Sequence, residues 1–309
     1  MIAIFGGDGF IGRHLTTRLL AGGEKVKVFS RRFDGVLDKN TTDYVQFIEG
    51  DFFHPMDRAN ALVGVEVVVQ LISTSSPGLK NDFAIADIQE NVIPHVEFIQ
   101  ECIRSGVEKI IFLSSGGTVY GPDAKVPSSE DSPTNPINSH GLTKLVVEKY
   151  LGMFGFVDGL NSITLRVSNP YGPGQQLKKG QGLVPAILRN ISLGEPIKIF
   201  GDGSARRDYI FIDDLIEAIL HAIKHNAKGG ELYNIGSGES RSVQEVVLAI
   251  EESLGIQIER EYLAARPTDV DVAYLNTTKA QDVLKWQPKV SFKKGIEKTI
   301  ADFMLARSR

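Results

Sequence analysis

His140 and Lys144 stand four residues apart in the stretch "NPINSHGLTKLVVEKY", residues 135–150. Residues at this spacing share one face of a helix, so both side chains can reach the same cleft. A neutral imidazole, with a pKa of about 6.5, accepts a proton at neutral pH without further activation. The ammonium group of Lys144 disfavours a second positive charge beside it and so lowers the histidine pKa. Such a pair has the chemistry needed for proton transfer, with a neutral imidazole as the acceptor beside a cationic ammonium group.

A glycine-rich turn opens the chain in "IAIFGGDGFIGRHLTTRLL". Gly6, Gly9 and Gly12 fall between an apolar strand and an amphipathic helix, where glycine allows a tight turn. Backbone amides at such a turn approach a pyrophosphate at the positive end of the helix. The pattern predicts a dinucleotide cofactor held by this turn, including Phe10 and Ile11.

The end of the second apolar strand, "KVKVFSRR", decides which dinucleotide fits. An acidic residue commonly stands there and bonds the adenosine ribose, but this chain has Ser30 followed by Arg31 and Arg32. Guanidinium groups suit a ribose 2'-phosphate, so both NAD and NADP are candidate cofactors. The alternative is that both arginines are solvated loop residues.

Val/Ile-rich runs alternate with amphipathic stretches through the first half of the chain. This order predicts an α/β fold with a Rossmann-like, doubly wound parallel sheet, because strands buried on both faces read as continuous apolar runs. After residues 162–169 the pattern changes to Gly/Pro-rich loops and shorter helices. We expect a cofactor-binding domain over 1–168, to which a segment near 206–234 returns, and a smaller C-terminal substrate-binding domain over 169–309.

Composition excludes several other classes of protein. A net charge of -4 over 309 residues argues against a nucleic-acid partner, and the single cysteine, Cys102, excludes an intrachain disulfide. The start "MIAIFGG" has no basic leader and no apolar run reaches membrane length, so we expect a soluble, cytoplasmic protein without a membrane partner. Glu217, His221 and His225 share a helix face, but we interpret them as a solvated helix end and expect no metal.

Motifs along the whole chain, in order and at consistent spacing, resemble those of an extended short-chain dehydrogenase/reductase of the NAD-dependent epimerase/dehydratase family. The matching stretches are "GGDGFIG", "FLSSGGTVYG", "HGLTKLVVEKY", "RVSNPYGPGQ", "IFGDGSARRDYIFIDDL", "YNIGSGES" and "ARPTDV". One letter departs from the family pattern: His140 occupies the position of the catalytic tyrosine.

The resemblance implies roles for further residues. Lys144 would hold the nicotinamide ribose, and a hydroxyl of Ser115 or Thr118 would assist proton transfer from the sugar O4. Asp51, Phe52 and Leu71 are implied as cofactor contacts. Ser115 and Asn169 are implied as contacts of a UDP-linked or similar nucleotide-diphosphate sugar, whose diphosphate Arg207 and Arg266 would clamp.

Three functions remain open for such a chain. The resemblance favours C4 epimerisation of a sugar of the UDP-glucose or UDP-N-acetylglucosamine type through a 4-keto intermediate. An NADPH-dependent ketoreductase and a binding protein that is weakly active or inactive because of His140 are the alternatives. Dehydratase chemistry is disfavoured, because Gly117 and Thr118 stand where dehydratases of the family carry an Asp-Glu pair. A homodimer built through the Lys144 helix is also implied.

Overall fold

The computed structural model describes residues 1–33, 44–75, 84–175, 182–266 and 270–307. Its centre is a parallel seven-stranded sheet in the order β11-β6-β5-β4-β1-β2-β3. The strands are β1 (Ile2–Phe5), β2 (Val26–Ser30), β3 (Val45–Glu49), β4 (Val67–Gln70), β5 (Lys109–Ser115), β6 (Asn161–Val167) and β11 (Gly230–Ile235). The predicted α/β, Rossmann-like fold is confirmed.

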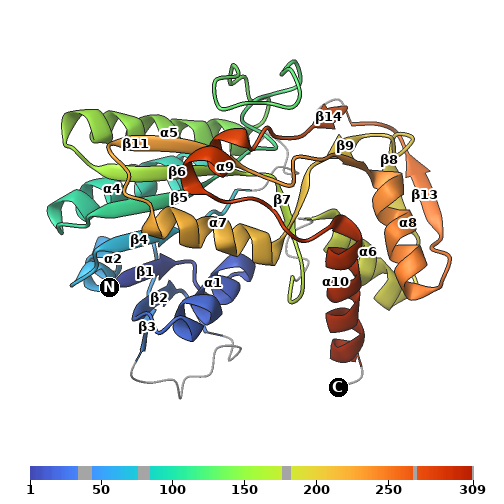
Figure 1. The fold of residues 1–309 in the computed structure, drawn as a ribbon, viewed down its shortest axis with the longest axis horizontal. Helices are drawn as coiled ribbons and strands as arrows, with labels where there is room; N and C mark the ends of the chain where they lie inside the picture. Colours follow the sequence, from blue (N-terminus) through green and yellow to red (C-terminus); the bar gives the residue numbers. More distant parts are fainter. Residues whose placement is uncertain (34–43, 76–83, 176–181, 267–269, 308–309) are drawn as a thin grey trace.

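Alternation along each strand divides the core into two layers. Ile2 and Ile4 of β1 pack into one layer, and Ala3 and Phe5 pack into the other. The first layer is covered by α1 (Phe10–Ala21) and α7 (Ile212–Lys224), which lie together in front of the sheet in Figure 1. The second is covered by α2 (Pro55–Leu62), α4 (Ile93–Arg104) and α5 (Ser139–Val157). Burial on both sheet faces explains the unbroken apolar strands.

Strand order fixes where a ligand can bind. β1 lies between β4 and β2, so the connections that follow β1 and β4 run to opposite sides of the sheet. In open α/β sheets ligands bind at the carboxyl ends of strands beside such a switch point. The glycine turn after β1 and the polar end of β5 therefore belong to one edge.

The sequence patterns did not predict two strands of the sheet. β3 is short and forms an edge, and β11 pairs with β6 although more than sixty residues separate them along the chain. β11 lies at the end of the segment near 206–234, which we expected to return to the first domain. The division into two domains itself stays a prediction.

The remaining elements form a smaller layer beside the carboxyl edge, on the right in Figure 1. Three short sheets occur there, β10-β7, β12-β9-β14 and β13-β8. Their strands are β7 (Asn169–Tyr171), β8 (Ile197–Phe200), β9 (Arg206–Arg207), β10 (Tyr209–Phe211), β12 (Arg241–Ser242), β13 (Arg260–Leu263) and β14 (Val272–Ala273). The helices are α6 (Leu183–Leu193), α8 (Val243–Leu254) and α10 (Phe292–Arg307), while α9 (Thr278–Leu284) packs against α7 and β11. Part of the first Gly/Pro-rich loop, residues 170–182, lies outside the described residues.

The glycine turn packs directly against the start of α1 at Gly12. A Cβ at this position would lie 2.4 Å from the Gly6 carbonyl oxygen and 2.5 Å from the Gly7 Cα, both main-chain atoms that cannot move independently. We expect Gly12→Ala to lower the free energy of unfolding by about 2–3 kcal/mol, as overpacking does, and to weaken dinucleotide binding. Gly152→Ala is the control, because a Cβ there meets nothing within 4 Å. Urea unfolding measures both, and equal stability of the two variants would contradict the packing described.

Candidate active site

A cleft of about 570 Å³ runs along the carboxyl edge of the sheet. It brings together the glycine turn, the end of β5, the start of α5 and the segment after β6. Its lining includes these residues from the sequence analysis: Gly6, Gly9, Phe10, Ile11, Gly12, Leu71, Ser115, His140, Lys144, Asn169 and Arg207. Residues from six separate parts of the sequence thus share one site.

His140 lies in the first turn of α5. The Asn138 side chain caps this helix by accepting a hydrogen bond from the Gly141 amide at 2.8 Å, which fixes the direction of the first turn. The His140 Nδ1 lies 3.2 Å from the Ser75 Oγ, and the ring is buried. Burial and, to a smaller extent, the charge of Lys144 together lower the pKa of His140 to about 3. The sequence argument named Lys144 as the cause, but loss of solvation is the larger one.

Lys144 follows one helical turn later and also lines the cleft. Its Nζ donates a hydrogen bond to the Leu113 carbonyl at 2.8 Å and lies 4.7 Å from the centre of the Phe112 ring. Burial lowers its pKa to about 8, while Glu148 acts in the opposite direction. The predicted pairing of imidazole and ammonium on one helix face is therefore present in the structure.

A buried ion pair lies beneath these two residues. Arg166 of β6 donates to Glu148 of α5 at 2.7 Å, and both side chains are almost fully enclosed. The Ser114 hydroxyl also donates to Glu148. Because one carboxylate joins β5, β6 and α5, this network fixes the helix against the strands that form the site.

The structure separates the two hydroxyl candidates of the loop after β5. Ser115 lines the cleft. The Thr118 hydroxyl is buried, is not among the groups that line the cleft, and has no hydrogen-bond partner within the described part of the chain. The reason is local: the Thr118 and Val119 amides both donate to the Ser115 carbonyl, which turns the chain away from the sheet edge. Of the pair, only Ser115 is placed for the predicted role.

The glycine turn carries a charged pair that the sequence patterns did not single out. Both Asp8 carboxylate oxygens accept hydrogen bonds from Arg13 at 3.1 Å, and both residues line the cleft. Asp8 also lines a second pocket, of about 710 Å³, at the ends of β2 and β3. The second pocket further includes Ser30, Arg31, Arg32, Glu49, Gly50 and Asp51. It therefore offers three carboxylates as well as the two predicted arginines.

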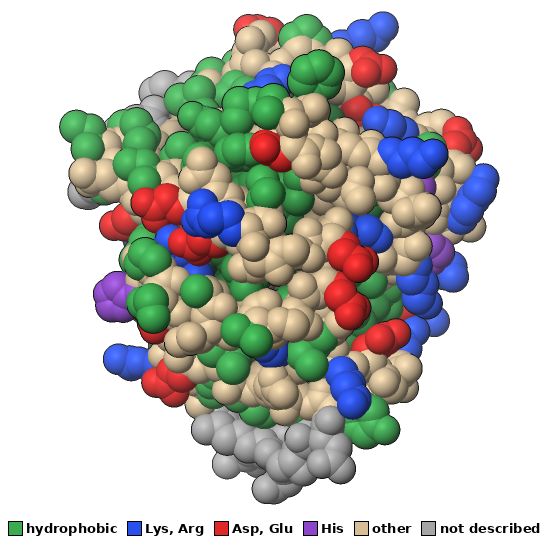
Figure 2. Space-filling view, turned by 90° about the vertical axis from the view of Figure 1, so that its left-hand side faces the viewer, with side chains coloured by type: hydrophobic (Ala, Val, Ile, Leu, Met, Phe, Trp, Pro, Cys, Tyr) green, Lys and Arg blue, Asp and Glu red, His purple; other side chains and the backbone are tan. Residues whose placement is uncertain are grey.

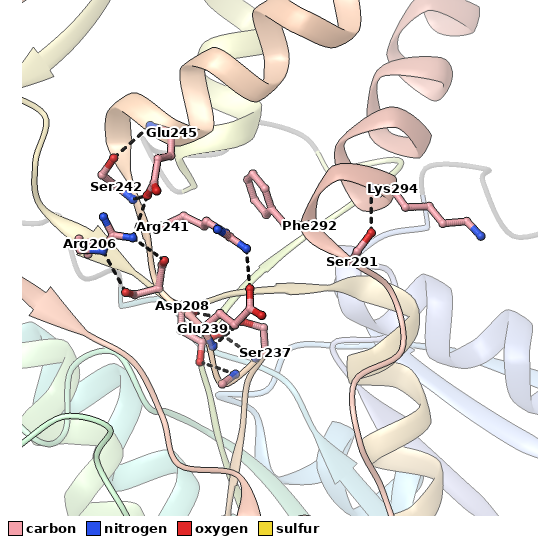
Figure 3. Close-up of polar contacts among 12 residues, drawn as sticks. Arg206, Asp208, Ser237, Glu239, Arg241, Ser242, Glu245, Ser291, Phe292 and Lys294 are labelled. Atoms are coloured by element: carbon pink, nitrogen blue, oxygen red, sulfur yellow. Dashed lines mark hydrogen bonds and ion pairs between the residues drawn. The ribbon is translucent and has the colours of Figure 1, made fainter.

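On the opposite wall, neighbouring arginines have different partners. Arg206 is held by Ser240, through its hydroxyl at 3.0 Å, and by Glu245 at 2.9 Å (Figure 3). Arg207 lines the cleft, with its Nη1 donating to the Arg206 carbonyl at 2.9 Å. Asn169 donates to the Asp208 carbonyl at 2.8 Å and also lines the cleft. Asn169 and Arg207 thus face the same space as His140.

Two predicted binding residues lie elsewhere. Phe52 is buried in the core against Phe5 and Phe98, and its side chain lines neither pocket, because the strand end places its ring under the sheet. Arg266 is exposed, with its guanidinium carbon 3.4 Å from the centre of the Phe200 ring, and it does not line the cleft. Stacking on Phe200, in β8, is the contact that holds this arginine.

The suspected metal face on α7 is occupied by other contacts. His221 Nδ1 lies 2.8 Å from the Leu284 carbonyl, His225 pairs with Glu231 at 2.8 Å, and Glu217 binds Arg18. The two histidines are partly buried rather than solvated, which corrects the interpretation of a solvated helix end. Across the described residues, no group of three or more His, Cys, Asp or Glu side chains could hold a metal. Nor does any described helix have the length and apolar character needed to cross a membrane.

A second buried histidine makes stability depend on pH. His95 of α4 packs against Phe52 and Phe112, and burial lowers its pKa to about 3. An unfolded histidine, with a pKa near 6.5, binds a proton between about pH 6.5 and 3 where the folded one does not. The free energy of unfolding should therefore fall as the pH drops through this window, by about 2 kcal/mol at pH 5 for His95.

Urea unfolding of His95→Leu at pH 7.5 and pH 5 measures this contribution. The loss of stability between the two pH values should shrink by about 2 kcal/mol relative to the unmodified protein. His54→Leu is the control, because the His54 side chain is 71% exposed. An unchanged pH dependence in His95→Leu would show that His95 is not held neutral.

A histidine-lysine pair beside a glycine turn, at the carboxyl edge of a seven-stranded parallel sheet, is typical of a dinucleotide-binding protein of the short-chain dehydrogenase/reductase class. Comparison with known families makes the assignment specific. The chain belongs to the NAD dependent epimerase/dehydratase family, whose model matches residues 2–236.

Individual relatives match over almost the whole chain. A UDP-glucose 4-epimerase of Mycolicibacterium smegmatis is 34% identical over 306 residues, covering 97% of each protein. A dTDP-4-dehydro-6-deoxyglucose reductase of Escherichia coli is 33% identical and covers 97% of this chain and 96% of its own. The crystal structure of a UDP-glucose 4-epimerase from Thermotoga maritima with UDP-glucose superposes with a TM-score of 0.91 at 32% identity, covering 99% of both chains.

Proposed function

We propose that the protein catalyses the NAD-dependent epimerisation, at C4, of a UDP-linked hexose of the UDP-glucose or UDP-N-acetylglucosamine type. The observation that carries the proposal is the single cleft in which the glycine turn, the His140-Lys144 pair and Arg207 meet. The epimerase relatives, which cover nearly the full length, support the same reaction.

The residues present fit a dinucleotide. Main-chain amides of the glycine turn stand at the N-terminus of α1, where the missing side chain at Gly12 lets the helix pack directly on the turn. The second pocket, with Ser30, Asp51 and the two arginines, would take the adenosine. Leu71 and Lys144 would border the nicotinamide and its ribose. NAD, when bound, supplies a hydride acceptor that takes the C4 hydrogen of the sugar and returns it.

Protein groups would handle the proton and the diphosphate. His140 takes the O4 proton as the sugar is oxidised and gives it back after the 4-keto sugar has turned, while Ser115 bonds the same oxygen. Arg207 and Asn169 bind the diphosphate and the sugar. The lowered pKa of His140, about 3, keeps the resting imidazole neutral at pH 7, although it also makes the imidazole a weak base.

The test is incubation of the protein with UDP-glucose and, separately, with UDP-N-acetylglucosamine, in the presence of a catalytic amount of NAD. The expected product is the C4 epimer, formed without a net change in nicotinamide absorbance. Mass spectrometry of small molecules released from the purified protein would identify the cofactor. Absence of any bound or titratable nicotinamide dinucleotide would rule out this function.

A ketoreductase is the second candidate, favoured by two observations. Arg31 and Arg32 line the pocket expected to hold the adenosine ribose, where they would attract a 2'-phosphate. The Escherichia coli relative at 33% identity is named as a reductase of a 4-keto sugar nucleotide. A reductase would consume NADPH in proportion to a 4-keto substrate, whereas an epimerase would not. A cofactor- and nucleotide-sugar-binding protein with little turnover would do neither while still binding both ligands.

A homodimer in the cytoplasm completes the proposal. Apolar side chains are exposed on α5, on the helical segment before α4 and at the first residue of α4: Leu142, Val146, Met153, Ile85, Ile88 and Ile93. Figure 2 shows the side of the molecule where α4 and α5 end, with hydrophobic side chains gathered over its upper part, at the height of α5 in Figure 1. Apolar side chains exposed on helical segments that contact each other, as α5 and Ile88–Val92 do, are typical of a subunit interface.

Sedimentation velocity tests the dimer. The protein should sediment as twice its chain mass of 33.8 kDa. Val146→Glu places a charge in the apolar face and should shift the equilibrium to monomer, whereas Leu248→Glu, at an exposed position on α8, should not. A monomeric unmodified protein would contradict the proposal.

A further inference from the structure

The second partner of Ser75 determines how it can bond His140. The Ser75 hydroxyl donates a hydrogen bond to Asp87 Oδ2 at 3.2 Å, and its oxygen lies 3.2 Å from His140 Nδ1. An ionised carboxylate only accepts hydrogen bonds, so the single hydroxyl proton of Ser75 points to Asp87. The lone pairs that remain on Ser75 must then accept a proton carried by His140 Nδ1. Hydrogen-bond direction along this chain thus selects one tautomer of the imidazole.

Asn91 holds the chain of hydrogen bonds in place. It lies in the π-helical turn Ile88–Val92 and is buried. Its Nδ2 donates to Thr74 Oγ1 at 2.8 Å and to Asp87 Oδ1 at 3.4 Å, and its Oδ1 accepts from the Thr74 amide at 2.9 Å. A π-helical turn is an irregularity that often occurs at functional sites. One amide side chain therefore fixes both Asp87 and the loop that carries Ser75.

We propose that Asp87, acting through Ser75, is a positioning residue that holds His140 as its Nδ1-protonated tautomer, so that Nε2 is the atom that exchanges protons in the cleft. The hydrogen bonds that the described residues make with the His140 ring all go to Ser75, through its hydroxyl and its main chain. Among charged groups, Lys144 faces His140 from the same helix, Glu148 faces Lys144 from the next turn, and Asp87 approaches from the neighbouring segment.

The catalytic consequence rests on the proposed function. As the sugar C4–H bond gives up its hydride, the O4–H proton moves to Nε2 and the C4=O double bond forms. The imidazolium then keeps its original proton on Nδ1, bonded through Ser75 to a negative carboxylate, which offsets the nearby charge of Lys144. Return of the hydride draws the Nε2 proton back to O4, so the histidine ends each cycle in its starting tautomer.

The tautomer of His140 can be determined by NMR on the protein alone, without any measurement of catalysis. Protein labelled with ¹⁵N-histidine is examined at pH 7 by long-range ¹H–¹⁵N correlation, and His140 is assigned by loss of its signals in His140→Gln. The unmodified protein should show Nδ1 protonated and Nε2 unprotonated. Ser75→Ala and Asp87→Asn should each bring in the Nε2-protonated form, whereas Glu90→Gln, an exposed change on the same π-helical turn, should not.

Kinetics then separate positioning from folding. Asp87→Asn should lower kcat by about 10- to 100-fold, as loss of a group that orients a histidine does, with KM and the dissociation constant of NAD changed less than about twofold. A protonated Nε2 in the unmodified protein, or an unchanged tautomer in both Ser75→Ala and Asp87→Asn, would overturn the proposal. Lack of turnover with every UDP-sugar would instead count against the proposed function and leave the NMR result standing.

Discussion

Replacement of His140 by alanine should lower kcat for the UDP-sugar by about 10²- to 10⁴-fold, the usual contribution of a positioned acid or base. The imidazole is the titratable group nearest the start of α5, it is buried, and its pKa is lowered to about 3, so it stands neutral beside the cleft. Alanine leaves the helix intact but removes every proton-transfer atom at this position. Binding of NAD should change little, because the glycine turn and Lys144 are retained.

Steady-state kinetics and a titration with NAD measure the two effects of His140→Ala separately. His54→Ala is the matched control, because that side chain is 71% exposed and lies outside the cleft. If His140→Ala kept turnover within a few-fold of the unmodified protein, His140 would not be the acid or base. A second variant, His140→Tyr, introduces the residue that the family resemblance implies at this position. Failure of this variant to raise turnover would count against the alternative of an enzyme damaged at this position.

Replacement of Lys144 by methionine should have a comparable effect, of at least about 10²-fold on kcat/KM, because it removes a preorganised cation from the reacting centre. Lys144 Nζ donates to the Leu113 carbonyl at 2.8 Å, so methionine also leaves that buried acceptor without its donor. Unlike His140→Ala, this variant should bind NAD more weakly, since Lys144 is the side chain proposed to hold the nicotinamide ribose.

A spectroscopic result distinguishes Lys144→Met from a general loss of structure. The positive charge of Lys144 is one of the two causes that lower the pKa of His140, so its removal should raise that pKa. Histidine NMR measures the shift. Lys149→Met, an exposed change on the same helix, should alter neither the His140 pKa nor NAD binding. An unchanged His140 pKa in Lys144→Met would show that the two groups do not interact.

Sequence patterns were sufficient where a contact follows from local periodicity. The strands β1, β2, β4, β5 and β6 read as apolar runs, and the spacing of His140 and Lys144 placed both on one helix face, as the structure shows. The glycine turn could be located because its function needs a strand before it and a helix after it. These features depend on residues that are close together in the chain, so they can be predicted from composition and spacing.

Contacts between distant segments could not be read in the same way. Asp87 and Ser75 have no periodic relation to His140, and only the folded loop brings them together. Arg266 matched a family motif, yet stacking on Phe200 takes it out of the cleft. Thr118 lay three residues from Ser115, and a turn of the main chain directs its hydroxyl elsewhere. In each case a tertiary contact decided the direction of the side chain.

The most direct test of the proposed reaction is the fate of deuterium at C4 of UDP-glucose. Hydride that leaves C4 and returns within one active site should give a C4 epimer that keeps the deuterium, with no label lost to water and no net NADH. His140→Ala should form this product at least about 10² times more slowly. Loss of the deuterium to solvent, or an equal rate of labelled product from His140→Ala and the unmodified protein, would contradict epimerisation with His140 as the proton-transfer group.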